Sequence, residues 1–117
     1  MSNDALIENS MSILINAGEA RNLIKNAYDH IMVNEYDLAK KCIEDAHKYI
    51  LEAHKRQTGE LQKEASGEEP EYSILFSHAQ DTIMTINSEF ITCKKMLDIF
   101  RKIDDRFIAL EEKLDYV

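Results

Sequence analysis

Residues 72–100 read YSILFSHAQDTIMTINSEFITCKKMLDIF. Apolar side chains recur in this stretch at alternating steps of three and four residues, which places them along one side of an α-helix. The members of this apolar seam are Tyr72, Phe76, Ala79, Ile83, Ile86, Phe90, Cys93, Leu97 and Phe100. The stretch therefore predicts one long helix that buries a continuous seam against the rest of the chain.

A second series with the same spacing lies roughly 140° around this helix from the apolar seam. This polar stripe is short of long charged side chains and consists of Ile74, His78, Asp81, Thr85, Ser88 and Thr92. Solvated helix faces usually carry Lys and Glu. The stripe is therefore either an unusual solvent face or a contact surface that carries chemistry, and geometry alone leaves both interpretations open.

Helix-breaking residues are scarce elsewhere, since the chain has one proline and three glycines. A first helix is predicted from about Asp4 to Val33, ended by Asn34, a residue type that tolerates a left-handed backbone. A second helix follows from about Glu35 to Ala65. The first helix is expected to carry Met11, Leu14, Gly18, Ile24, Tyr28 and Ile31 near its apolar face. Along the second, Ala39, Ile43, Ala46, Ile50, Ala53, Gln57 and Leu61 follow one another at steps of three or four.

Two of the glycines, Gly18 and Gly59, fall inside predicted helices, where glycine destabilises a helix by about 0.5–1 kcal/mol relative to alanine. Close approach of a neighbouring helix is the expected reason for their presence. The third glycine lies in the clearest break of the chain, Ser66–Pro70. There Gly67 suits the position after a helix end, and Pro70 suits the first turn of the next helix.

The third helix is predicted from about Glu69 to beyond Phe100. Because short loops make consecutive helices antiparallel neighbours, the fold class is all-α, an up-down-up three-helix bundle. The 117 residues are expected to form a single domain. The form of residues 102–117 stays open: a continued helix, a coiled-coil-like projection or a frayed tail.

Composition excludes several classes of protein. With 14 basic and 22 acidic residues the net charge is -8, which argues against a nucleic-acid phosphate partner. No apolar run approaches the roughly 20 residues that span a bilayer, so a soluble, cytoplasmic protein is expected. Cys42 and Cys93 lack the spacing of a zinc site and are expected to be free, buried thiols.

Four motifs, in order along the chain, resemble one known family. They are INAGEAR at residues 15–21, EAHKRQTGEL at 52–61, EASGEE at 64–69, and Tyr72-Ser73 followed by HAQDTIMT at 78–85. Together they closely resemble the lactose/cellobiose-type IIA proteins of the bacterial sugar phosphotransferase system, over roughly residues 11–100. A single His-x-x-Asp on a helix would be weak evidence, whereas four motifs with the right spacing are strong evidence.

The resemblance implies that His78 is a phosphorylated histidine, modified at Nε2, and that the protein is a phosphotransferase. The donor would be the histidine-phosphorylated carrier HPr. The acceptor would be a cysteine of the IIB component, which serves the IIC sugar permease in the membrane. The sugar would be a β-linked disaccharide of the lactose, cellobiose or chitobiose type, and the sequence does not choose among them.

Positioning and stabilisation of the phosphoryl oxygens are most of what such a carrier requires. Gln80 offers an amide donor, and Thr82 offers a hydroxyl one turn on from His78. Members of the family often carry a second histidine where this chain has Thr82. Arg21 has two interpretations, an ion pair on a helix face or a cation that supports the phosphoryl charge.

The resemblance also implies a homotrimer, a nine-helix bundle in which Asp81 of each subunit faces a threefold axis. Three carboxylates cannot share a buried point without protonation or a cation. A divalent ion with oxygen ligands, Mg²⁺, would relieve the repulsion. The polar stripe is consistent with this arrangement, because the other two helices cover only one side of the third.

Two other classes stay open at this point. One is a helical phosphorelay domain, which also places a phosphorylated histidine on a helix of a bundle. The other is a non-catalytic oligomeric adaptor, in which His78 is only an interface residue.

Overall fold

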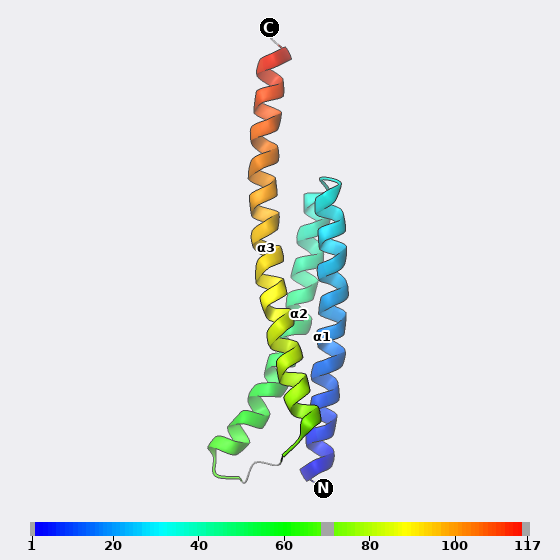
Figure 1. The fold of residues 1–117 in the computed structure, drawn as a ribbon, viewed down its shortest axis with the longest axis vertical. Coiled ribbons are helices and arrows are strands. Elements are labelled where there is room, and N and C mark those ends of the chain that lie inside the picture. Colours follow the sequence, from blue (N-terminus) through cyan, green and yellow to red (C-terminus); the bar gives the residue numbers. More distant parts are fainter. Residues whose placement is uncertain (1, 69–71, 116–117) are drawn as a thin grey trace.

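The computed structural model describes residues 2–68 and 72–115, and within these ranges the secondary structure is entirely helical. Helix α1 spans Ser2–Met32, α2 spans Tyr36–Ala65 and α3 spans Ile74–Asp115. The predicted up-down-up order is confirmed (Figure 1). The molecule is elongated, 74 Å along its longest axis, because α3 continues well beyond the end of the α1–α2 hairpin. None of the described helices is both long enough and apolar enough to cross a bilayer.

The first two helix ends lie where the sequence placed them. Asn34, between α1 and α2, has a φ angle of 62°, and the amide of Glu35 donates to the carbonyl oxygen of His30. Gly67, after α2, has a φ angle of 101°, and its amide donates to the carbonyl oxygen of Glu64. Both residues therefore end their helices in the left-handed conformation that asparagine and glycine tolerate.

The start of α3 was predicted wrongly. Tyr72 and Ser73 are not helical, so α3 begins at Ile74 instead of near Glu69. The reason is a side-chain cap: the hydroxyl oxygen of Ser73 accepts a hydrogen bond from the amide of Phe76 at 3.0 Å. The role predicted for Pro70 in the first turn lies outside the described residues.

The apolar seam of α3 is largely confirmed. Its members from Phe76 to Leu97 are buried against the α1–α2 hairpin. Tyr72 and Phe100, at the two ends of the predicted seam, are 89% and 45% exposed. Tyr72 precedes the helix, and Phe100 lies where α3 leaves the hairpin. The seam is therefore buried only along the length that the hairpin covers.

The buried face of α1 differs from the prediction. Met11 is exposed and Leu14 only partly buried, whereas the small residues Ser10, Ala17 and Ala20 are buried. The full buried set of α1 is Leu6, Ser10, Ile13, Ala17, Ala20, Ile24, Ala27 and Ile31. Close packing against Ala39, Ala46 and Ala53 of α2 selects small side chains, while the prediction favoured large ones. The sets predicted and observed share Ile24 and Ile31.

Gly18 and Gly59 do not mark a close helix–helix approach within the chain. A Cβ atom added at either position would meet nothing within 4 Å. On α1 the contact is made instead by the neighbouring Ala17, which is fully buried.

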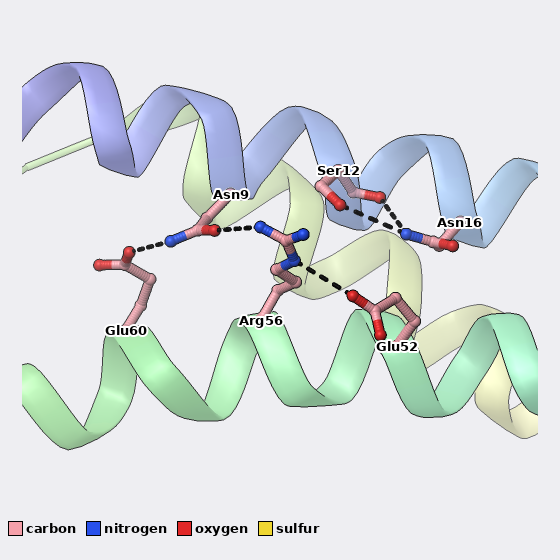
Figure 2. A network of polar contacts seen from close by, with 6 residues as sticks. All are labelled: Asn9, Ser12, Asn16, Glu52, Arg56 and Glu60. Atoms are coloured by element: carbon pink, nitrogen blue, oxygen red, sulfur yellow. Dashed lines mark hydrogen bonds and ion pairs between the residues drawn. The ribbon is translucent and has the colours of Figure 1, made fainter.

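One buried polar residue was not predicted. Glu60 of α2 is buried, and its carboxylate accepts a hydrogen bond from Asn9 of α1 at 2.5 Å and pairs with Lys63 at 3.3 Å. Asn9 in turn accepts a bond from Arg56 at 3.1 Å, so the network links α1 to α2 (Figure 2). Glu60 continues the steps of four and three that run through Ala53 and Gln57, whereas the predicted Leu61 is exposed.

Candidate functional site

The polar stripe of α3 is uncovered along its whole length. All six of its residues, Ile74, His78, Asp81, Thr85, Ser88 and Thr92, are exposed, while the apolar seam beside it is buried by α1 and α2. His78 follows the Ser73 cap by just over one helical turn, which fixes its position on a regular helix. The imidazole of His78 takes part in no hydrogen bond or ion pair with the described residues, and it is open to solvent.

Two threonines, Thr85 in the stripe and Thr82 beside it, turn their hydroxyl groups back to the helix. Thr82 donates to the main-chain carbonyl oxygen of His78 at 2.8 Å, and Thr85 donates to that of Asp81 at 2.9 Å. Such bonds satisfy the hydroxyl group locally. Thr82 is therefore near His78 as expected, about 40° around the helix from it, with its hydroxyl hydrogen already engaged.

Gln80 lies on another side of α3. Two residues along a helix correspond to about 200°, so Gln80 is about 160° around α3 from His78. Its amide oxygen accepts a hydrogen bond from Nε2 of Gln57 on α2 at 3.2 Å. The structure thus brings Gln80 together with Gln57 and not with His78 of the same chain.

Asp81 is exposed on the stripe, and none of the described residues forms an ion pair or hydrogen bond with its carboxylate. No group of three or more His, Cys, Asp or Glu side chains in the described ranges is arranged to hold a metal ion. One chain therefore offers a single carboxylate at this place. Its oxygen atoms are of the hard type that Mg²⁺ prefers, and further ligands would have to come from other copies or from water.

A groove of about 430 Å³ lies between α1 and α3, and the stripe residues Thr85, Ser88 and Thr92 line it on the α3 side. Arg21 of α1 lies in it and binds Glu89 of α3 with two hydrogen bonds, at 2.9 and 3.3 Å. The groove is centred on Ser88, ten residues or roughly 15 Å along α3 from His78. Of the two interpretations of Arg21, the structure shows the ion pair.

Two of the other histidines have side-chain partners of their own. The Nδ1 atom of His30 lies 3.1 Å from a carboxylate oxygen of Glu35, and the ring of His47 stacks on Phe90 with a centroid distance of 5.3 Å. His54 is partly buried on α2. Neither His30 nor His47 belongs to the polar stripe, so His78 is the exposed histidine on the face that carries the candidate site.

The two cysteines are free, with Cys93 buried and Cys42 partly buried. Burial raises the pKa of both thiols above the ordinary value, so neither is activated as a thiolate. The expected structural role of both residues agrees with this environment.

Comparison with known protein families gives one match that covers most of the chain. A family model described as "PTS system, Lactose/Cellobiose specific IIA subunit" matches residues 8–101. The lactose-specific EIIA component of Staphylococcus epidermidis is 36% identical over 90 residues, which are 77% of this chain and 86% of that protein. The corresponding component of Lactococcus lactis is 40% identical over 73 residues, 62% of this chain and 70% of that protein.

Solved structures give the same result. The crystal structure of PtcA from S. mutans superposes with a TM-score of 0.83 and 33% identity, over 86% of this chain and 99% of that one. A IIA(Chitobiose) chain, from solution structures of its complex with HPr in Escherichia coli, superposes with a TM-score of 0.71 and 25% identity. That match covers 85% of this chain and 96% of the other.

Proposed function

We propose a phosphocarrier mechanism centred on His78, starting from the fact that this chain belongs to the lactose/cellobiose-specific IIA family of the sugar phosphotransferase system. In this mechanism HPr, phosphorylated on a histidine, is the donor. A cysteine of the IIB component is the acceptor, and the IIC permease takes up the sugar, a β-linked disaccharide. The solved complex of IIA(Chitobiose) with HPr supports the choice of donor. All of these steps are proposed to take place in the cytoplasm.

One observation carries the assignment of the site. His78 is exposed on a helix face that the α1–α2 hairpin leaves open, inside the segment matched by the family model. A carrier must present its nucleophile to two different proteins in turn, so an open imidazole on a regular helix fits the task. The Ser73 cap and the regular helix that follows hold the backbone of His78 in place.

The reaction needs little from neighbouring acids or bases. The lone pair of Nε2 of His78 attacks the phosphorus atom, a new N–P bond forms, and the N–P bond of the donor histidine breaks. One proton passes from the acceptor ring to the donor ring through solvent. Rate then depends on alignment of the two rings and on donors for the phosphoryl oxygens.

Two side chains are proposed to supply such donors. The hydroxyl of Thr82 can exchange its acceptor, the carbonyl oxygen of His78, for a phosphoryl oxygen by rotation about one side-chain bond. The amide of Gln80 points to α2 in its own chain. It can therefore serve a phosphoryl group on His78 only when it comes from a neighbouring copy.

A homotrimer built on α3 would bring such copies together. The polar stripe is open and flanked by the exposed apolar side chains of Met84 and Ile91. Helix α1 presents a further exposed apolar row, Ile7, Met11 and Ile15. This exposed apolar surface beside a stripe without lysine or glutamate supports burial against other subunits.

At the threefold axis of that trimer, Asp81 of three chains is proposed to hold Mg²⁺. The open position and oxygen donors of the Asp81 carboxylate fit such an ion. When bound, the ion would supply the positive charge that allows three carboxylates to approach. Thr85 supports this position by bonding to the main chain of Asp81.

Incubation with labelled phosphoenolpyruvate, enzyme I and HPr tests the function. The wild-type chain is expected to acquire an acid-labile, base-stable label, and His78→Gln is expected to acquire none while its circular dichroism is unchanged. His54→Ala is the matched control and should be labelled like the wild type. Label on the His78→Gln variant would overturn the assignment of the phosphorylated residue.

A further inference from the structure

The C-terminal part of α3 carries an apolar seam that none of the described residues covers. In Figure 1 the last third of the helix projects beyond the hairpin. Near the point where α3 leaves the hairpin, Arg101 forms an ion pair with Asp37 at 2.8 Å and stacks over the ring of Tyr36. The family model ends at residue 101, so the projection is not part of the family match.

Six exposed apolar residues of this part follow a strict heptad spacing, with exposed Ile99 and Ile108 outside it. Steps of four, three, four, three and four residues lead through Met96, Phe100, Ile103, Phe107, Leu110 and Leu114. Exposure rises along this seam from 37% at Met96 to 70% at Leu114. A seam of two apolar positions per seven residues is the pattern by which helices pair in coiled coils. In heptad notation Phe100, Phe107 and Leu114 are a positions, and Met96, Ile103 and Leu110 are d positions.

The surface of the seam already has the shape that pairing requires. Ile103, Arg106, Phe107 and Leu110 line a hollow of about 250 Å³. These residues stand at i, i+3, i+4 and i+7, which are the four positions that form a hole for an a-position side chain of a facing, parallel helix. Phe107 of a second copy, in the same register, is the side chain that would enter it.

The charges beside the seam identify the partner and its direction. Along residues 103–114 the g positions next to the seam are Arg106 and Lys113, both basic, and the e positions are Asp104 and Glu111, both acidic. In parallel pairing each g residue faces the e residue five positions later on the other helix, so Arg106 meets Glu111 of the second copy. Antiparallel pairing would set basic against basic and acidic against acidic.

The seam also lies near the polar stripe. At 100° per residue it is displaced by about 40° from the stripe and by about 100° from the buried seam of α3. Copies that associate through the polar stripe would therefore bring their projecting helices side by side. A lone helix end with six exposed large apolar side chains is marginal in water, and association would stabilise it.

We propose that residues 96–114 of α3 form a parallel, in-register coiled coil between copies of this chain. It continues the trimer proposed above beyond the part that the family shares. The coiled coil holds the copies together by apolar packing, independently of a metal ion at Asp81. Its role is to keep the carrier assembled when the ion is lost.

Disulfide cross-linking of the full-length chain tests the register. In Leu110→Cys the thiols of two copies would meet in the seam, whereas in Glu112→Cys they would point outward. We expect disulfide-linked dimers to form roughly tenfold faster in Leu110→Cys, because the seam raises the local thiol concentration. Introducing Phe107→Glu into the Leu110→Cys chain should abolish this excess. Equal rates for Leu110→Cys and Glu112→Cys would overturn the proposal.

Charge reversal tests direction and partner. Arg106→Glu and Glu111→Arg are each expected to shift sedimentation of the chelator-treated protein towards the monomer, and the double variant is expected to restore assembly. Glu112→Arg, the same change on the outer face, should behave like the wild type. A double variant no better than the two single ones would contradict the parallel homotypic arrangement. Sedimentation of the chelator-treated wild-type chain as a monomer would also contradict it. The seam would then be a contact surface for a different protein.

Discussion

The hydroxyl of Thr82 donates a hydrogen bond to the main-chain carbonyl oxygen of His78, with a distance of 2.8 Å between the two oxygen atoms. This bond links the proposed phosphorylated residue to the side chain one turn further along α3. It also means that the hydroxyl has an acceptor before any phosphoryl group arrives. The gain from Thr82 in the phosphorylated state is therefore the difference between two hydrogen bonds, of which the one to an anion is the stronger.

Thr82→Val should consequently lower phosphoryl acceptance by a moderate amount. The valine variant lacks the charge-assisted bond in the phosphorylated state and the bond to the carbonyl oxygen in the unphosphorylated state. The difference between these two losses destabilises the phosphorylated state by about 1.4 kcal/mol, which lowers the rate about tenfold. Thr82→Ser keeps the hydroxyl and should react like the wild type. The measurement is the single-turnover rate of transfer from phospho-HPr. Equal rates for the valine and serine variants would show that Thr82 serves only its own helix.

The Ser73 cap should contribute to the stability of the site region. Ser73→Ala removes the acceptor of the Phe76 amide, and loss of a helix cap costs about 1 kcal/mol. Ser77→Ala, an exposed position in the first turns of the same helix, is the matched control and should change stability little. Urea denaturation of both variants measures the difference. A cap variant as stable as the control would place the start of α3 elsewhere.

The sequence predicted the helices well wherever a single strong signal marks a boundary or a face. Asn34 and Gly67 were recognised because few other residues adopt their backbone conformation. The buried seam of α3 was recognised from its unbroken spacing. By contrast, the start of α3 was predicted too early, because Pro70 was assigned to the first turn of the helix and the capping role of Ser73 was not recognised. On α1, large side chains such as Met11 were preferred to the alanines that a close contact requires.

The candidate site could be predicted only in part, for a different reason. Residue types and spacing place His78, Asp81 and Thr82 on one open face of α3, as the structure does. Gln80 also offers a hydrogen-bond donor, yet its position two residues after His78 places it on the side of α3 that faces Gln57 of α2. In the proposed trimer other chains complete the site around His78, and the sequence of one chain contains no direct record of their positions.

Gly18 provides a test of what lies against α1. Since a Cβ atom would meet nothing within 4 Å in the chain, Gly18→Ala should raise the free energy of unfolding by about 0.5–1 kcal/mol. Gly67→Ala is the opposite case, because its φ angle of 101° strains any other residue, and it should destabilise. Thermal unfolding of both variants gives the two signs. A destabilised Gly18→Ala would indicate that another copy approaches this position closely.

Stability should decline at alkaline pH because of the buried thiol. Burial raises the pKa of Cys93 above its ordinary value of 9.0. Below that value the thiol is protonated in both states and the stabilising contribution is complete. As pH rises further, the unfolded chain loses its proton first, so the free energy of unfolding falls until the folded pKa is passed. Urea titrations between about pH 8 and about pH 10 should show a shallower decline for Cys93→Ala. An identical decline in the wild type and in Cys93→Ala would show that other groups cause the effect. Tyr28 is one such group, because burial raises its pKa as well.

The assembly at Asp81 gives the last prediction. With Mg²⁺ present, the wild-type chain should sediment at three times its 13.5 kDa mass. Three uncompensated carboxylates at one point would cost several kcal/mol, so a chelator should weaken the assembly. The effect should be clearest in Phe107→Glu, where the projecting seam no longer contributes.

Substitutions at Asp81 separate charge from packing. In the Phe107→Glu background, where the projecting seam no longer contributes, Asp81→Lys places three cations at the axis and should dissociate the trimer. In the same background Asp81→Leu removes the repulsion and should give a trimer that is insensitive to chelator. Asp98→Lys, the same charge reversal further along α3, is the control and should sediment like the wild type. If a neighbouring copy completes the site around His78, phosphoryl acceptance should fall in Asp81→Lys together with the loss of the trimer. A wild-type monomer at micromolar concentration with Mg²⁺ present would rule out the trimer, and with it the metal site.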